Sequence, residues 1–282
     1  YLQLRAARLC LQKAALPQEK VQLALAGDLQ AQCTASSYAM RELGVPFAGL
    51  FGACSTMAEG LALGAALCEG GAARNLLAMA SSHFCAAERQ FRTPLSYGAV
   101  RTPTAQWTAT AAGCCLLQPQ GEGVGIAAAT FGRVQDYQVK DINNMGAAMA
   151  PAAASTLLHY FKDTGTEPQE FDCIYTGDLG QVGSQLLREL LAAEGLLIKN
   201  HVDCGCILFD ANEQSVKSGG SGPGCCAAVL CGHILPRLRR GSQKRVLFTA
   251  TGALMSQTTF LQKETIPAVA HLVELRAPEK EK

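Results

Sequence analysis

The chain has 282 residues, of which 49% are hydrophobic and 17% charged, and its formal net charge at pH 7 is +1. This length and apolar content suffice for a large core, in one domain or in two fused halves, which excludes a disordered tail. The near-zero charge excludes the basic footprint of a nucleic-acid-binding protein, and no apolar run approaches the roughly 18 residues that a membrane-spanning helix needs. No signal segment opens the chain, so we expect a cytoplasmic protein, and its 28 glycines and abundant alanine favour the α/β class.

The chain opens inside a helical pattern. Leu2, Leu4, Leu9 and Leu11 lie at roughly helical spacing, and no capping residue precedes them. Because the first residue is Tyr1 and not methionine, we expect that some N-terminal structure is absent from this sequence.

An internal repeat is the strongest organising feature. Residues 21–43 and residues 171–190 each contain an apolar strand, a Gly-Asp-Leu corner and a helix that ends in Arg-Glu-Leu. Asp28 and Asp178 therefore occupy equivalent places. Such a repeat indicates a duplicated supersecondary unit, although two ordinary strand–helix units could resemble each other by coincidence.

A second matched pair supports the duplication. Residues 52–81 and residues 219–252 each run from a Gly/Ser-rich corner through a helix of small residues to a buried apolar strand. We therefore predict an α/β fold with two equivalent halves, residues 1–145 and residues 146–282. Further strands are expected at residues 113–118, 124–131, 203–209 and 271–276.

The 13 cysteines do not have the spacing of a metal site or of a disulfide framework. Cys204 and Cys206 alternate as on one face of a strand, and Cys225, Cys226 and Cys231 fall in an Ala-rich helix. Buried, reduced thiols are the expected state, and we predict neither a bound metal nor a cofactor.

One cysteine has a distinctive position. An apolar strand ends near Gly52, Cys54 follows, and Ser55 and Thr56 begin a helix. A thiol at a helix N-terminus meets free backbone N–H groups and the positive end of the helix dipole, which favour a thiolate or an anionic ligand. Cys54 is thus a candidate nucleophile or ligand contact, and the alternative is a packed structural cysteine.

Polar residues follow the next buried strand. His83, Glu88, Arg89 and Arg92 come just after its carboxyl end, where α/β sheets collect their ligands. His83 is interpreted equally well as a ligand contact or as a hydrogen-bonded structural histidine. For Arg89, an ion pair with Glu88 is the simpler interpretation.

The second half carries comparable corners. The sequence GGSGPGCC, which contains Ser221, supplies helix N-terminal amides and glycines that let a ligand approach the backbone. Asp178 is interpreted first as the N-cap of the helix that follows it, and otherwise as a carboxylate that faces the site.

Taken together, these motifs resemble the thiolase-like superfamily, which includes the chain-initiating ketoacyl synthases. The resemblance extends to a sporulation branch of that superfamily and runs in order along nearly the whole chain, through AGDL, FGACST, SSHFCAAERQFR, GAAMAPAAA, TGDLGQVGS, GGSGPGC and QKETIPAVAH. It implies a duplicated five-layer αβαβα fold, usually a homodimer, with the cysteine between the halves.

The sporulation relatives imply a binding function. They are associated with dipicolinic acid, as such or as its calcium chelate, and with its uptake into the developing spore beside channel proteins of the spore inner membrane. Peripheral attachment to that membrane is an expectation from this resemblance. The ligand set would then be Cys54, Ser221, His83 and Arg89, with Asp28 or Asp178 as carboxylates for calcium.

The resemblance also shows a departure from the enzymes. Condensing enzymes place a histidine where this chain has residues 176–178, and an asparagine or a second histidine where it has residues 220–222. Without an imidazole, Cys54 lacks the usual base for acyl transfer, unless His83 supplies it. The alternatives are an acyltransferase or ketoacyl-synthase-like enzyme that uses Cys54 as an acyl-accepting nucleophile, or a purely structural partner in a membrane-associated complex.

Overall fold

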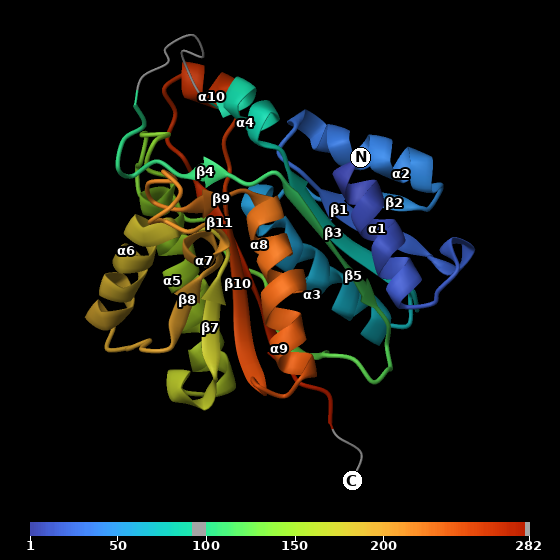
Figure 1. The fold of residues 1–282 in the computed structure, drawn as a ribbon. Coiled ribbons are helices and arrows are strands. Elements are labelled where there is room, and N and C mark those ends of the chain that lie inside the picture. The colour runs from blue at the N-terminus through green and yellow to red at the C-terminus, as the bar shows by residue number, and fades with distance from the viewer. Residues whose placement is uncertain (92–99, 280–282) are drawn as a thin grey trace.

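The computed structural model describes residues 1–91 and 100–279 as five layers, in which two large sheets alternate with helices (Figure 1). Four helices cover the outer faces of the sheets, namely α1 (Leu2–Lys13) and α2 (Thr34–Leu43) on the first sheet and α5 (Met145–Thr164) and α6 (Gly180–Ala193) on the second. Two helices lie between the sheets, α3 (Thr56–Glu69) and α8 (Pro223–Val229). The predicted five-layer α/β fold is confirmed.

The first sheet has four strands in the order β2-β1-β3-β5. Its strands are β1 (Leu23–Gly27), β2 (Phe47–Gly49), β3 (Leu76–Ser82) and β5 (Ala111–Leu117). The first three are parallel, and β5 pairs with β3 antiparallel. All seven residues of β3 are buried, as expected for a strand covered by helices on both faces.

The second sheet has five strands in the order β6-β11-β10-β7-β8. They are β6 (Gly125–Thr130), β7 (Cys173–Thr176), β8 (His201–Asp203), β10 (Arg245–Ala253) and β11 (Ala268–Arg276). Here too the three strands β8, β7 and β10 are parallel, and the last strand, β11, returns antiparallel. The shared strand order confirms the duplication that the repeat predicted.

The extra strand β6 lies before the predicted boundary at residues 145/146 but pairs with β11 of the second sheet. The boundary itself stays a prediction. Short elements lie in the upper part of Figure 1, namely α4 (Phe84–Phe91), β4 (Trp107–Thr108), β9 (Gly220–Ser221) and α10 (Gln257–Leu261). Helix α7 (Cys204–Leu208) lies beside α8, and α9 (Leu235–Arg239) follows α8 at its lower end.

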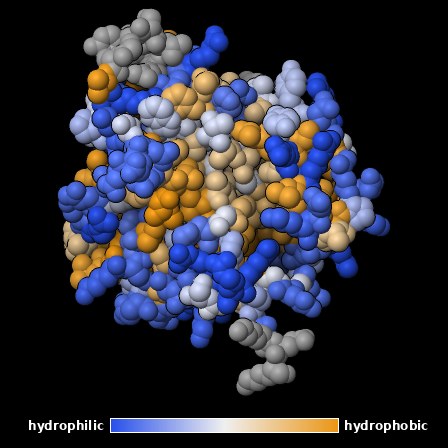
Figure 2. Space-filling model, in the orientation of Figure 1, coloured by the Kyte–Doolittle hydropathy of each residue, from blue (hydrophilic) through white to orange (hydrophobic). Residues whose placement is uncertain are grey.

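Large side chains fill the space between the two sheets. Met57 of α3, Tyr175 of β7 and Phe248 of β10 are almost completely buried there, together with the small residues of α8. Each buried side chain of this size contributes about 1.5–3 kcal/mol relative to exposure. Figure 2 shows apolar surface over α7 and α8 amid hydrophilic surface, and Ile207 of α7 is 41% exposed.

One predicted strand is wrong. We expected a strand over residues 203–209, but β8 ends at Asp203 and Cys204–Leu208 form the helix α7. A Cβ on Gly205 would lie 2.5 Å from the carbonyl oxygen of Gly220, so this turn approaches β9 closely, and only glycine permits that. Cys204 and Cys206 therefore do not share a strand face. The prediction failed because a short run of small apolar residues looks the same in the sequence whether it forms a strand or a buried helical turn.

The other cysteines follow the predicted helix but only in part the predicted burial: eight of the 13 are buried, four are half-buried, and Cys85 is exposed. Cys225 and Cys226 lie in α8, and Cys231 lies in the π-helical turn Leu230–Ile234 that continues it. All 13 cysteines are free thiols. Over residues 1–91 and 100–279, no helix combines the length and apolar character needed to cross a bilayer, and no cluster of side chains has the geometry of a metal site.

Candidate functional site

Cys54 lies on a tight corner between the end of β2 and the start of α3. It occupies the 3-10 turn Ala53–Ser55, and Ala53 has a positive φ of 50°, a conformation that is unfavourable for alanine. Strand β10 of the second half presses against this corner, because a Cβ at Gly252 would lie 2.1 Å from the carbonyl oxygen of Gly52. The corner is therefore held between the two halves, and Cys54 is 8% exposed.

The corner after β7, in the second half, presents Asp178, which is completely buried. Its Oδ2 accepts hydrogen bonds from the backbone N–H of Gly222 at 2.7 Å and from the hydroxyl of Ser221 at 3.3 Å. Its Oδ1 accepts a bond from the Thr251 hydroxyl at 3.5 Å. The preferred interpretation of Asp178 as a helix cap is wrong: its carboxylate bonds to Ser221, Gly222 and Thr251, and α6 begins at Gly180 without a cap from it.

Cys54 and Asp178 meet between the halves. The thiol donates a hydrogen bond to the Asp178 carboxylate. Burial raises the pKa of Cys54 well above its ordinary value, and the charge of Asp178 and this bond raise it further. Burial also raises the pKa of Asp178, while its bonds from Cys54 and Gly222 oppose that effect. The sulfur at this corner is thus a neutral thiol, because burial and the carboxylate outweigh the helix dipole.

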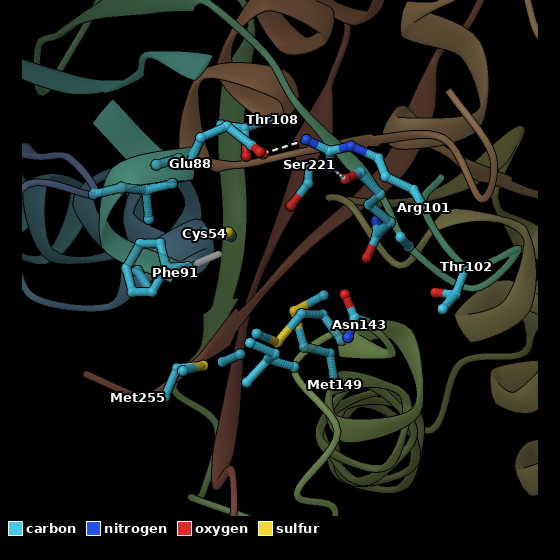
Figure 3. Close-up of a pocket in the computed structure, with 18 of the residues that line it drawn as sticks. Cys54, Glu88, Phe91, Arg101, Thr102, Thr108, Asn143, Met149, Ser221 and Met255 are labelled. Atoms are coloured by element: carbon cyan, nitrogen blue, oxygen red, sulfur yellow. Dashed lines mark hydrogen bonds and ion pairs between the residues drawn. The ribbon is translucent and has the colours of Figure 1, made fainter. Parts of the chain in front are cut away.

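A cavity of about 440 Å³ opens in front of Cys54 (Figure 3). In the view of Figure 3, Arg101 and Glu88 lie above the sulfur and Met149 and Met255 below it. The apolar lining residues are Leu29, Ala53, Ala87, Phe91, Val100, Ala105, Ile142, Met145, Met149, Ala253 and Met255. The lining residues with polar groups are Cys54, Glu88, Arg101, Thr102, Gln106, Thr108, Asn143 and Ser221.

Among residues 1–91 and 100–279, Arg101 is the cation that lines this cavity, and sequence reasoning did not find it. Its guanidinium lies 4.5 Å from the ring centre of Trp107 and 5.5 Å from that of Phe84. It forms an ion pair with Glu88, and its Nη1 donates to the carbonyl of Gln106 at 3.1 Å. These contacts hold the charge in place. Its nearness in sequence to the only tryptophan was the one available signal.

Strand pairing across the halves brings these groups to Ser221. Strand β4 pairs in parallel with β9, which places Trp107 opposite Gly220 and Thr108 opposite Ser221. The backbone N–H of Trp107 donates to the carbonyl of Gly219 at 2.8 Å. The segment that carries Arg101 is therefore attached to the GGSG corner that binds Asp178.

Of the predicted site residues, the structure brings three together. Cys54 and Ser221 line the cavity, and Asp178 lies directly behind them. Over residues 1–91 and 100–279, no histidine lines it.

The other predicted residues lie elsewhere. His83 and Arg89 are exposed and do not line the cavity. The expected pair of Arg89 with Glu88 is replaced by the ion pair of Glu88 with Arg101, because α4 turns Glu88 inward. Arg92 lies outside the described residues.

Asp28 does not reach the cavity either. Its Oδ2 accepts bonds from the backbone N–H and the hydroxyl of Ser36 at 2.8 and 2.6 Å, and its Oδ1 accepts one from the N–H of Gln30 at 2.7 Å. Asp28 thus closes the turn into α2. The two aspartates are equivalent in the repeat but not in their contacts.

Comparison with known proteins decides the family. Residues 1–276 match the family described as Stage V sporulation protein AD (SpoVAD). The chain is 43% identical over 267 residues to Stage V sporulation protein AD of Bacillus subtilis (strain 168). The aligned residues cover 94% of this chain and 79% of that protein. This chain belongs to the SpoVAD family.

The fold of this SpoVAD-family chain is thiolase-like. It resembles 3-oxoacyl-[acyl-carrier-protein] synthase III from Aquifex aeolicus VF5 with a TM-score of 0.61 and 14% identity, over 98% of this chain and 83% of that chain. It also resembles cerulenin-bound OleA from Xanthomonas campestris with a TM-score of 0.65 and 15% identity, over 98% and 79%. At such identities the likeness concerns the fold alone.

The site of this SpoVAD-family chain has its own chemistry. Asp178 and Ser221 lie in the two segments where the resemblance to condensing enzymes leads us to expect a histidine, and an asparagine or a second histidine. A carboxylate beside a buried thiol opposes formation of the thiolate, whereas an imidazole would promote it. The arrangement is suited to holding a ligand in front of a neutral thiol.

Proposed function

We propose that this SpoVAD-family protein binds dipicolinic acid, or its calcium chelate, in the cavity at Cys54 for uptake into the developing spore, without condensing acyl chains. One observation carries the proposal. The cavity combines a fixed cation, Arg101, with a cysteine whose hydrogen-bond partner is the carboxylate of Asp178. Such a wall supports recognition of a small anion more than nucleophilic chemistry.

The shape and polarity of the cavity support a small planar ligand. A volume of about 440 Å³ accommodates a single aromatic ring with two carboxylates. Phe91, Met149 and Met255 offer apolar surface for the faces of a ring. Arg101 and Asn143 offer hydrogen-bond donors for carboxylate oxygens.

The charges favour the calcium chelate over the free dianion. Arg101 is already paired with Glu88, and Asp178 lies behind the wall. A ligand with two negative charges would meet one paired cation and a second buried carboxylate. In the chelate, calcium neutralises the ligand, so the complex enters without this repulsion.

Isothermal titration of the purified protein with dipicolinate, with and without calcium, tests the proposal. We expect saturable heat with calcium, and a loss of affinity of roughly tenfold or more in the variant Arg101→Gln. The exposed Arg89 lies outside the cavity, so Arg89→Gln is the matched control and should bind as the wild type does. Absence of heat at millimolar dipicolinate in both conditions would overturn the proposal.

A second candidate is an acyltransferase or ketoacyl-synthase-like enzyme that uses Cys54 as acyl acceptor. The opening of the cavity onto Cys54 favours it, and an OleA structure of the same fold is described with bound lauric acid and lauroyl-CoA. Incubation with acyl-CoA followed by intact-mass measurement distinguishes the two. An acyl adduct that disappears in Cys54→Ala would support the enzyme, and its absence would support the binding protein.

We also propose that the protein forms a homodimer and meets channel proteins of the spore inner membrane. For the dimer, β2 is an edge strand of the first sheet, and Phe51 just beyond it is 66% exposed. An exposed edge with a large aromatic side chain is a suitable surface for a second copy. Light scattering of the purified protein would test the dimer, and co-purification from spore membranes would test the membrane partners.

A further inference from the structure

A second buried carboxylate, Asp203, accepts hydrogen bonds from residues on both sides of Asp178 in the sequence. It is the last residue of β8 and is 3% exposed. Its Oδ2 accepts bonds from the hydroxyl of Thr176 at 2.6 Å and from the backbone N–H of Leu179 at 2.9 Å. Its Oδ1 accepts a bond from the backbone N–H of Gly180 at 2.9 Å. The three donors lie on both sides of Asp178 in the sequence.

These bonds determine the path of the backbone at the corner. Helix α6 begins here without a side-chain cap from its own N-cap residue, Leu179, so Asp203 supplies the capping carboxylate from the neighbouring strand. Gly180 has a φ of +66°, and a Cβ there would lie 2.5 Å from the carbonyl oxygen of Ser218. The corner can therefore take this tight shape only while the amides of residues 179 and 180 stay anchored.

The direction of the Asp178 side chain depends on this anchor. Its Oδ2 reaches the N–H of Gly222 at 2.7 Å, on a segment that follows Asp203 in the chain and belongs to another corner. We infer that Asp203 is a positioning residue of the Cys54 site: by holding residues 176, 179 and 180, it keeps the Asp178 carboxylate on the Cys54 thiol. The inference rests on the proposed function only in taking this corner as the ligand site.

His201 forms a further hydrogen bond to Thr176, the residue whose hydroxyl bonds to Asp203. The Thr176 hydroxyl has one proton and gives it to Asp203, so His201 Nε2, 2.8 Å away, must donate to Thr176. Burial lowers the pKa of His201 to about 4, so the ring is neutral and its Nδ1 is an acceptor. The titratable and charged groups around Asp203 are Asp178, Arg188, His201, Cys204, Cys206, Cys225 and Cys226.

The pH dependence of Cys54 alkylation, followed by peptide mass spectrometry, tests the inference without any ligand. Asp203→Asn puts an amide where two backbone N–H groups need acceptors, so the corner shifts and Asp178 moves away from Cys54. We expect the alkylation rate of Cys54 at pH 8 to rise about tenfold, because the thiolate fraction grows tenfold for each unit by which the pKa falls.

A thermodynamic cycle separates positioning from general destabilisation. In the background Asp178→Asn, the change Asp203→Asn should alter the Cys54 rate less than about twofold, because its route of action is already removed. Leu187→Ala, which removes a buried side chain of α6, is the control: it should lower the melting temperature and leave the Cys54 profile unchanged. An unchanged Cys54 profile in Asp203→Asn, or full additivity with Asp178→Asn, would overturn the inference.

Thr176 provides a second route if Asp203→Asn does not fold. Thr176→Val removes one of the three bonds and should raise the Cys54 rate by a smaller factor, whereas Thr176→Ser keeps the hydroxyl and should restore it. A Thr176→Val protein with the wild-type profile would count against the inference. Titration of the wild type with dipicolinate is a separate measurement. Absence of binding there would contradict the proposed function and would leave the conclusion about Asp203 unchanged.

Discussion

The Cys54 thiol, on the corner between β2 and α3 of the first half, donates a hydrogen bond to the Asp178 carboxylate, on the corner after β7 of the second half. The two halves thus meet through a thiol–carboxylate pair, and both groups are buried. Because a negative charge beside sulfur favours the protonated thiol, this pair explains how a cysteine on a helix N-terminus can remain unreactive.

Removal of the Asp178 charge should make Cys54 more reactive. In Asp178→Asn, the pKa of Cys54 falls toward its ordinary value, although burial still raises it, and we expect alkylation by iodoacetamide at pH 8 to accelerate about tenfold. Asp28→Asn is the matched control, because Asp28 is the repeat-equivalent aspartate and contacts Ser36 instead. Equal rates in wild type and Asp178→Asn would show that the carboxylate does not restrain the thiol.

The aromatic clamp around Arg101 should matter for binding. Trp107→Leu removes the ring 4.5 Å from the guanidinium and the stack with Phe84 at 4.6 Å. Because a cation–π contact of this kind contributes about 0.5–2 kcal/mol, we expect dipicolinate affinity to fall roughly twofold to thirtyfold. Trp107→Phe keeps a ring and should lose less. Calorimetric titration measures both, and identical affinities for the two variants would contradict the role of the ring.

The contact between Gly252 and Gly52 should be sensitive to a single methyl group. Gly252→Ala places a Cβ 2.1 Å from the carbonyl oxygen of Gly52, so either β10 or the Cys54 corner must move. We expect a loss of about 1–3 kcal/mol in the free energy of unfolding, measured in urea, together with altered alkylation of Cys54. Gly232 has open space around its Cβ position, and Gly232→Ala should leave both measurements near the wild type.

A buried ion-pair network should make stability depend on acid. Burial would raise the pKa of Glu274, but hydrogen bonds from Arg245, Tyr160 and Arg276 lower it to about 2, below its ordinary 4.5. A depressed carboxyl pKa stabilises the fold above pH 4.5, and that contribution is lost as pH falls toward 2.

The variant Glu274→Gln tests this network. At pH 7 it leaves Arg245 without its main partner, and we expect a loss of about 3 kcal/mol in the free energy of unfolding. The difference from the wild type should shrink between pH 4.5 and pH 2, as the wild-type carboxyl becomes protonated. Urea denaturation across this range measures it, and a difference that stays constant with pH would exclude Glu274 as the titrating group.

Much of the fold could be predicted from local patterns. The apolar runs of β1, β3, β7 and β10 bounded by glycine, and the repeated Gly-Asp-Leu corners, predicted the strands and the duplication. Each of these features lies within one short segment of the sequence, so it can be recognised without knowing the tertiary contacts. The same local reasoning was wrong for residues 203–209, because the close approach of Gly205 to Gly220 lies outside any local pattern.

The sequence by itself placed Cys54 on a strand-to-helix corner of a duplicated α/β fold, through the local order of strand, glycine and helix signals. Its motifs also carried the resemblance that implied the family and the five layers. Only the tertiary structure decided what Cys54 meets. Asp178 comes from the other half, Arg101 comes from an irregular segment attached through β4 and β9, and Asp203 acts from a neighbouring strand. These partners lie far from Cys54 in the chain, so their contacts depend on how the sheets stack and not on any spacing in the sequence.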